Sequence, residues 1–124
     1  MTLIAWLMLA AAFLPYVAAV CAKGGAKGFD NDDPRVWLAR QEGWRARANA
    51  AQANLFEGLP FFYAAVLFAL YNQASPDYVA GLMLAWLAAR LGYLWFYIAG
   101  RGALRSLIWA VSLVLDIAIL FAGA

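Results

Sequence analysis

Long uncharged apolar segments limit the possible folds of this chain more than any other feature of its sequence. Residues 2–22 carry no charged side chain, and about 20 apolar residues are enough for a helix to cross the hydrocarbon core of a membrane. The run is too long for the apolar core of a usual signal peptide, and no basic segment precedes it, so we interpret it as a span. Of the 124 residues, 67% are hydrophobic and 13% are charged. This composition favours an all-α integral membrane protein and disfavours a soluble domain.

Three further apolar segments follow the first, at about residues 44–72, 76–99 and 103–121. Short polar turns separate the later segments, and Pro76 suits the first position of the third helix. A glycine-rich, charged loop over about residues 23–43 joins the first span to the second. The sequence thus predicts a single domain over residues 1–124, a four-transmembrane-helix bundle. Its second helix should begin near Arg35 and continue without interruption to near Asn72.

The basic residues predict how the bundle lies in the membrane. Of the nine Lys and Arg residues, all except Arg90 flank the first or the third connection. Because cytoplasmic loops carry an excess of Lys and Arg, these two connections should be cytoplasmic. Both termini should then lie on the non-cytoplasmic side of a multi-pass membrane protein.

The second span carries polar side chains deep into an apolar run. At a period of 3.6 residues, Arg47, Asn54 and Glu57 share one face of the helix. Gln52 lies off this face and could reach a neighbouring helix. Charge at membrane depth costs a few kcal/mol on insertion scales, so such residues normally face the bundle interior. Gly58 would let another helix approach closely beside Glu57.

The third span carries a second polar stripe. Arg90, Tyr93, Tyr97 and Arg101 fall on one side of the predicted helix. Arg90 lies in an otherwise apolar setting, so we expect it to pair with an acidic side chain.

The fourth span, from about residue 103, carries Arg105 and Ser106 near its start and contains Ser112 and Asp116 on the face that carries Arg105. Asp116 lies about 16 Å along the helix axis from Arg105, too far for a direct pair. We therefore expect a partner for Asp116 from another span.

Composition excludes several kinds of chemistry. The chain has no histidine and a single cysteine, Cys21, so an internal disulfide is impossible and a metal site is not expected. Nothing indicates nucleic-acid binding. Proton or anion chemistry would have to come from Arg, Tyr, Ser, Asp or Glu side chains.

The chain carries two separated polar motifs. The first is Arg47 followed by Gln52, Asn54 and Glu57, just ahead of Pro60. The second is Arg-Gly-Ala-Leu-Arg-Ser over residues 101–106, opening the last helix after a tyrosine-bearing span. Together they resemble the motifs of the MAPEG family, the membrane-associated proteins in eicosanoid and glutathione metabolism. The resemblance covers nearly the whole chain.

The resemblance implies a homotrimer that binds glutathione between neighbouring subunits near the cytoplasmic face. It implies that Arg47, Asn54 and Glu57 hold the glutathione backbone and that Tyr93 or Tyr97 adds a hydroxyl group. It implies that Arg105 and Ser106 face the thiol. The full set of candidate glutathione-binding residues is Arg47, Gln52, Asn54, Glu57, Arg90, Tyr93, Tyr97 and Arg101, with Arg105 and Ser106 as the catalytic pair.

The expected function is that of a glutathione-dependent transferase or peroxidase acting on a lipophilic electrophile or a lipid hydroperoxide. The chain departs from the family pattern at Ala50 and Gln52, where enzymatic members often have Arg and His, and at Trp109, where several have Tyr. The alternative is therefore a non-catalytic MAPEG-like scaffold that binds lipids or a partner protein. A third interpretation is a small transporter that uses the buried charges as an ion path.

For the polar residues themselves, purely structural roles also stay open. Asn54, Glu57 and Arg90 could fix the register of packed helices, because polar side chains hydrogen-bond between helices in membranes. Arg101 and Arg105 could anchor helix ends at the membrane surface.

Overall fold

The computed structural model describes residues 1–124 and contains six α-helices and no strand. Four helical segments are long and apolar enough to cross a membrane: α1 (Thr2–Lys23), α3 with α4 (Gly43–Glu57 and Leu59–Tyr71), α5 (Pro76–Ile98) and α6 (Gly102–Leu120). The short helix α2 (Pro34–Ala39) lies in the first connection. The prediction of an all-α membrane protein with a four-helix bundle is confirmed.

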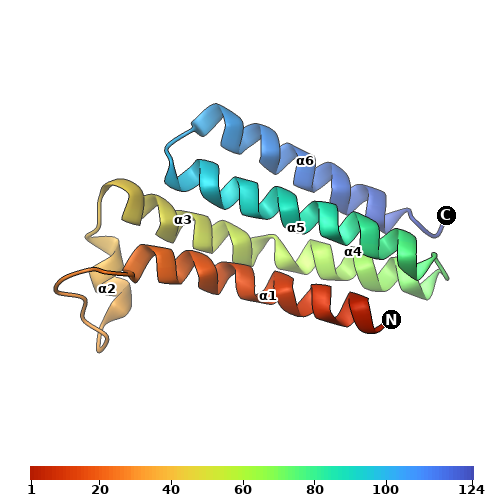
Figure 1. Cartoon of the computed structure of the whole chain (residues 1–124), viewed down its shortest axis with the longest axis horizontal. Helices are drawn as coiled ribbons and strands as arrows, with labels where there is room; N and C mark the ends of the chain where they lie inside the picture. Colours follow the sequence, from red (N-terminus) through yellow and green to blue (C-terminus); the bar gives the residue numbers. More distant parts are fainter.

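The four spans lie side by side, with both termini at one end of the bundle and α2 at the other (Figure 1). Helix α1 packs against α3 and α5, while α6 packs against α5 and α4. In the core, the Phe62 and Trp86 rings stack with their centroids 3.7 Å apart. Fully buried alanines such as Ala11 and Ala18 allow close approach of the helices, as is common in membranes.

Helix α6 lies at the edge of this bundle. Only Ser112, Asp116 and Ile119 are buried on it, whereas many of its large apolar side chains are exposed. Its polar buried side chains therefore face α4 and α5, and its outer surface is left for lipid or another subunit.

The prediction of one unbroken helix from Arg35 to Asn72 is wrong. The chain turns after α2, and Gly43, at which α3 begins, has a φ of 64°, a left-handed conformation that does not occur in the interior of a right-handed helix. A second interruption falls at Gly58, between α3 and α4. Pro60 has no N–H to donate to the carbonyl four residues earlier, which weakens the helix at this point.

Hydrogen bonds from arginine side chains join the ends of the helices on the α2 side. Arg47 Nε donates to the carbonyl oxygen of Ile98 at 3.0 Å, and Arg45 Nη1 donates to that of Ala22 at 3.0 Å. Carbonyls at a helix C-terminus lack intrahelical partners, and basic side chains near them are favourable. These bonds fix the start of α3 against the ends of α1 and α5, and so place Arg47 beside the turn that leads into α6.

Candidate functional site

The largest group of predicted site residues lines one open pocket of about 420 Å³ between α3, α5 and α6. Its walls bring together an acid, an amide, two tyrosines, an arginine and a serine. The lining residues are Ala50, Ala53, Asn54, Glu57, Tyr93, Tyr97, Arg105, Ser106 and Trp109. We call this cavity the α6 pocket. Residues from three helices thus meet in one concave site, which is the common form of a small-molecule binding site.

Arg105 packs against one aromatic ring in the α6 pocket. Its Cζ lies 4.6 Å from the centroid of the Tyr97 ring, a cation–π contact. Tyr97 in turn packs edge-on against Tyr93 with the ring centroids 5.6 Å apart. Arg105 is half-buried and Ser106, beside it, is exposed. The guanidinium therefore packs on the Tyr97 ring, and Ser106 follows Arg105 directly near the start of α6.

A smaller pocket of about 100 Å³ extends the site toward the turn between α5 and α6. It shares Tyr97 and Arg105 with the α6 pocket and adds Arg47 and Arg101. Three guanidinium groups therefore converge at one end of the bundle. Such a group of arginines favours an anionic ligand, because the planar guanidinium binds carboxylates through paired hydrogen bonds.

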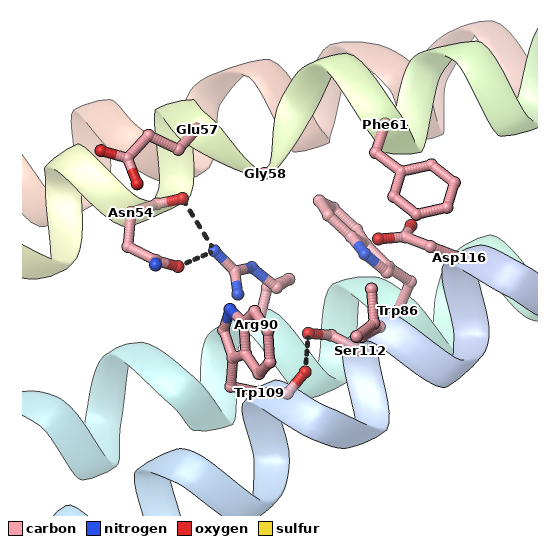
Figure 2. A pocket seen from close by; sticks show the side chains of 10 residues that line it. Asn54, Glu57, Gly58, Phe61, Trp86, Arg90, Trp109, Ser112 and Asp116 are labelled. Atoms are coloured by element: carbon pink, nitrogen blue, oxygen red, sulfur yellow. Dashed lines mark hydrogen bonds between the residues drawn. The ribbon is translucent and has the colours of Figure 1, made fainter.

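Arg90 does not bond to an acid, contrary to our expectation. It is 2% exposed, and its Nη2 donates to Asn54 Oδ1 at 2.8 Å and to the Asn54 carbonyl oxygen at 3.2 Å. Figure 2 shows both hydrogen bonds. The Arg90 Cζ also lies 4.5 Å from the centroid of the Tyr93 ring. Arg90 therefore orients the Asn54 side chain in the α6 pocket.

Gly58 makes the approach of Arg90 possible. A Cβ atom built at Gly58 would lie 3.3 Å from Arg90 Nη2 and 3.5 Å from the Asn54 carbonyl oxygen. A distance of 3.3 Å is tighter than ordinary van der Waals contact, so a Cβ atom here would require the guanidinium to shift by a few tenths of an ångström.

A model of the MAPEG family matches residues 1–124. The chain belongs to the MAPEG family. Searches of the curated proteins and of the solved structures return no match. Membership supports a glutathione-related transferase role, or a role in eicosanoid metabolism, for an integral multi-pass membrane protein. The family includes both enzymes and non-catalytic members, and its proteins are generally oligomeric.

The three positions expected from the sequence to depart from the family pattern do not all lie in the α6 pocket. Ala50 and Trp109 line the α6 pocket, so the side chains at these two positions form part of its wall. Gln52 is half-buried and lines neither this pocket nor its arginine-rich extension. The structure therefore does not bring Gln52 together with the other candidates within one chain.

Asp116 lies in a second cavity that the sequence did not predict. Figure 2 shows its carboxyl group beside the indole of Trp86, which comes from α5. No pattern distinguishes Trp86 from the other five tryptophans in the sequence, so only the fold reveals this neighbour. Ser112, one turn earlier, donates its hydroxyl hydrogen to the Trp109 carbonyl oxygen at 2.7 Å. No group of three or more potential metal-ligating side chains occurs in the structure.

Proposed function

We propose that this MAPEG protein is an integral membrane glutathione-dependent transferase or peroxidase. In this proposal it activates the glutathione thiol for attack on a lipophilic electrophile or a lipid hydroperoxide. The observation that carries the proposal is the α6 pocket, which holds Arg105 and Ser106 together with Asn54 and Glu57. Arg47 and Arg101 lie in its extension.

The charges in the site match those of glutathione. The tripeptide has two carboxylates and one ammonium group, and it gains a third negative charge when the thiol ionises. The site offers three guanidinium groups, from Arg47, Arg101 and Arg105, and one carboxylate, from Glu57. We infer that two arginines bind the carboxylates and that Glu57 accepts hydrogen bonds from the ammonium group.

Arg105 would then stabilise the thiolate. The thiolate is the nucleophilic form, and a nearby cation lowers the pKa of a thiol from about 8.5. The contact with the Tyr97 ring supports a guanidinium that is positioned beforehand, so that little reorganisation would be needed when charge develops. The hydroxyl of Ser106 or of a tyrosine can donate a further hydrogen bond. A lipophilic acceptor would enter laterally, past Trp109, which is 42% exposed.

We further propose a homotrimer in which a neighbouring subunit covers the open side of the α6 pocket and contacts glutathione. The exposed apolar face of α6 beside the pocket supports this arrangement. We also propose that the pocket opens on the cytoplasmic face, with both termini opposite. The clustering of basic residues at the α2 end supports this orientation.

Calorimetric titration of the purified protein in lipid nanodiscs tests the proposed binding mode. Glutathione should bind saturably. Glu57→Gln should lower the affinity for glutathione about tenfold, because a charge-assisted hydrogen bond contributes about 1.5 kcal/mol. The same substitution should leave the affinity for glutaryl-cysteinylglycine unchanged, because this analogue lacks the amino group. Glu42→Gln, an exposed acid at the start of α3, is the matched control.

Two outcomes would contradict the proposal. If the parent protein released no heat with glutathione yet bound lipids tightly, the non-catalytic scaffold would be favoured. If Glu57→Gln weakened glutathione and its deaminated analogue equally, Glu57 would not be the partner of the ammonium group.

A further inference from the structure

An apolar groove of about 520 Å³ lies between the end of α1, the start of α3 and the last two turns of α5. Apart from Gly24, the residues that line it are all hydrophobic. On α5 it is lined by Leu94 and Trp95, whereas Tyr93 and Tyr97 line the α6 pocket. We call it the α1–α5 groove. It shares no lining residue with the α6 pocket or its arginine-rich extension, so it is a separate site.

The α1–α5 groove has the depth of the outer part of one membrane leaflet. It lies at the end of the bundle that carries α2, where α1 and α5 both end (Figure 1). Its wall on α5 extends from Leu91 to Ile98, which is about 10 Å along a helix axis, and the hydrocarbon of one leaflet is about 15 Å thick. Trp44 and Trp95 line the groove and are 43% and 70% exposed. Tryptophan is enriched where the membrane meets water, so the groove would open to lipid just below the headgroups.

Positive charge lies at the outer end of the α1–α5 groove. The Arg45 Cζ is 4.3 Å from the centroid of the Trp44 ring, and Arg45 Nη1 donates to the Ala22 carbonyl oxygen, two residues before Gly24, at 3.0 Å. A guanidinium has five N–H groups, so four remain for other acceptors. Lys23 precedes Gly24 directly. Because a guanidinium binds phosphate oxygens through paired hydrogen bonds, this end of the groove suits an anionic phosphate group.

We propose that the α1–α5 groove binds an anionic phospholipid of the membrane. One acyl chain lies in the groove against Leu94, and the phosphate group accepts hydrogen bonds from Arg45. A zwitterionic lipid offers the same chain and phosphate, but its headgroup also carries a cation, which Arg45 and Lys23 repel. The groove therefore selects a lipid by its net charge, and it does so without glutathione.

Photo-cross-linking in phosphatidylcholine proteoliposomes tests the site. The probe is phosphatidylglycerol with a diazirine in one acyl chain, and mass spectrometry maps the labelled residues. Labelling should fall on residues 20–24 and 91–98, and unlabelled phosphatidylglycerol should suppress it. A phosphatidylcholine probe with the same diazirine, at equal trace mole fraction, should label these residues about fivefold less, because basic residues near the membrane surface attract anionic lipids.

Substitutions separate the headgroup contact from the acyl-chain contact. Arg45→Gln should lower labelling by the phosphatidylglycerol probe about fivefold and leave labelling by the phosphatidylcholine probe unchanged. Arg35→Gln, at an exposed arginine on α2, should change neither. Leu91→Trp places a larger side chain in the groove and should lower labelling by both probes. Leu84→Trp is the matched control, because Leu84 lies two turns earlier on α5 and is equally exposed, at 51%.

Equal labelling by the two probes, or an Arg45→Gln variant that keeps the preference, would overturn the proposal. So would equal labelling of Leu91→Trp and Leu84→Trp. A groove that no probe labels is the result expected if a second copy of the chain covers it, and this result also overturns the proposal. Glutathione titration of the same variants should give the affinity of the parent, because the groove and the α6 pocket share no lining residue.

Discussion

Arg90 should affect glutathione binding only through Asn54, and a double-mutant cycle can show this. Arg90→Met replaces the buried guanidinium with an unbranched apolar side chain. It removes the 2.8 Å hydrogen bond that holds Asn54 Oδ1. Charge-assisted hydrogen bonds contribute about 1.5–3 kcal/mol in proteins, and side-chain hydrogen bonds within membranes often contribute less. We therefore expect a coupling of about 1–2 kcal/mol, equivalent to an affinity change of about 5-fold to 30-fold.

The assay is calorimetric titration with glutathione of the parent, Arg90→Met, Asn54→Ala and the double variant. Gel filtration and melting temperature identify the variants that remain folded. Arg90→Met should weaken glutathione binding in the parent background and should have a much smaller effect once Asn54 is alanine, because only the hydrogen bond to the backbone carbonyl is then left to lose. If Arg90→Met weakens binding equally in both backgrounds, Arg90 contacts the ligand or shapes the site independently, and the positioning role is refuted.

Two further predictions concern packing. Gly58→Ala should lower the affinity for glutathione several-fold, because the new Cβ would lie 3.3 Å from Arg90 Nη2 and would displace the group that orients Asn54. Gly81→Ala, where a Cβ meets nothing within 4 Å, should instead raise the melting temperature by helix propensity alone; equal glutathione affinities in the two variants would contradict the steric argument. Tyr63→Phe loses the 2.7 Å hydrogen bond to the Met8 carbonyl oxygen between α4 and α1. Thermal unfolding should show a loss of about 1 kcal/mol with unchanged glutathione affinity, and an unchanged melting temperature would mean that this bond contributes nothing.

The architecture could be predicted because the membrane constrains it strongly. An uncharged apolar segment such as residues 2–22 is expected to form a membrane-spanning helix, because a helix satisfies all backbone hydrogen bonds within the segment. Helical periodicity placed Asn54 and Glu57 on one face of the second span and Tyr93 on the polar stripe of the third, and the family resemblance implied that they form one site with Arg105. Periodicity does not determine which faces meet, and only the structure shows that these residues line one pocket.

The sequence predictions that were wrong concern features that depend on contacts between helices or on the conformation of a single residue. The apolar period of the second span gives no sign of the turn before Gly43, which depends on a positive φ. The partner of Arg90 could not be predicted, because an amide and a carbonyl from α3 replace the expected carboxylate. Trp86 looked like any interfacial tryptophan, yet it stacks on Phe62 and faces Asp116.

Thiolate formation tests the central claim most directly. Stopped-flow mixing of the purified protein with glutathione should produce the ultraviolet absorbance of a thiolate. Arg105→Ala should reduce this absorbance at least tenfold at neutral pH, because the cation that lowers the thiol pKa is removed. Arg35→Ala, an exposed arginine on α2, should leave it unchanged. An Arg105→Ala variant that forms as much thiolate as the parent would contradict the account.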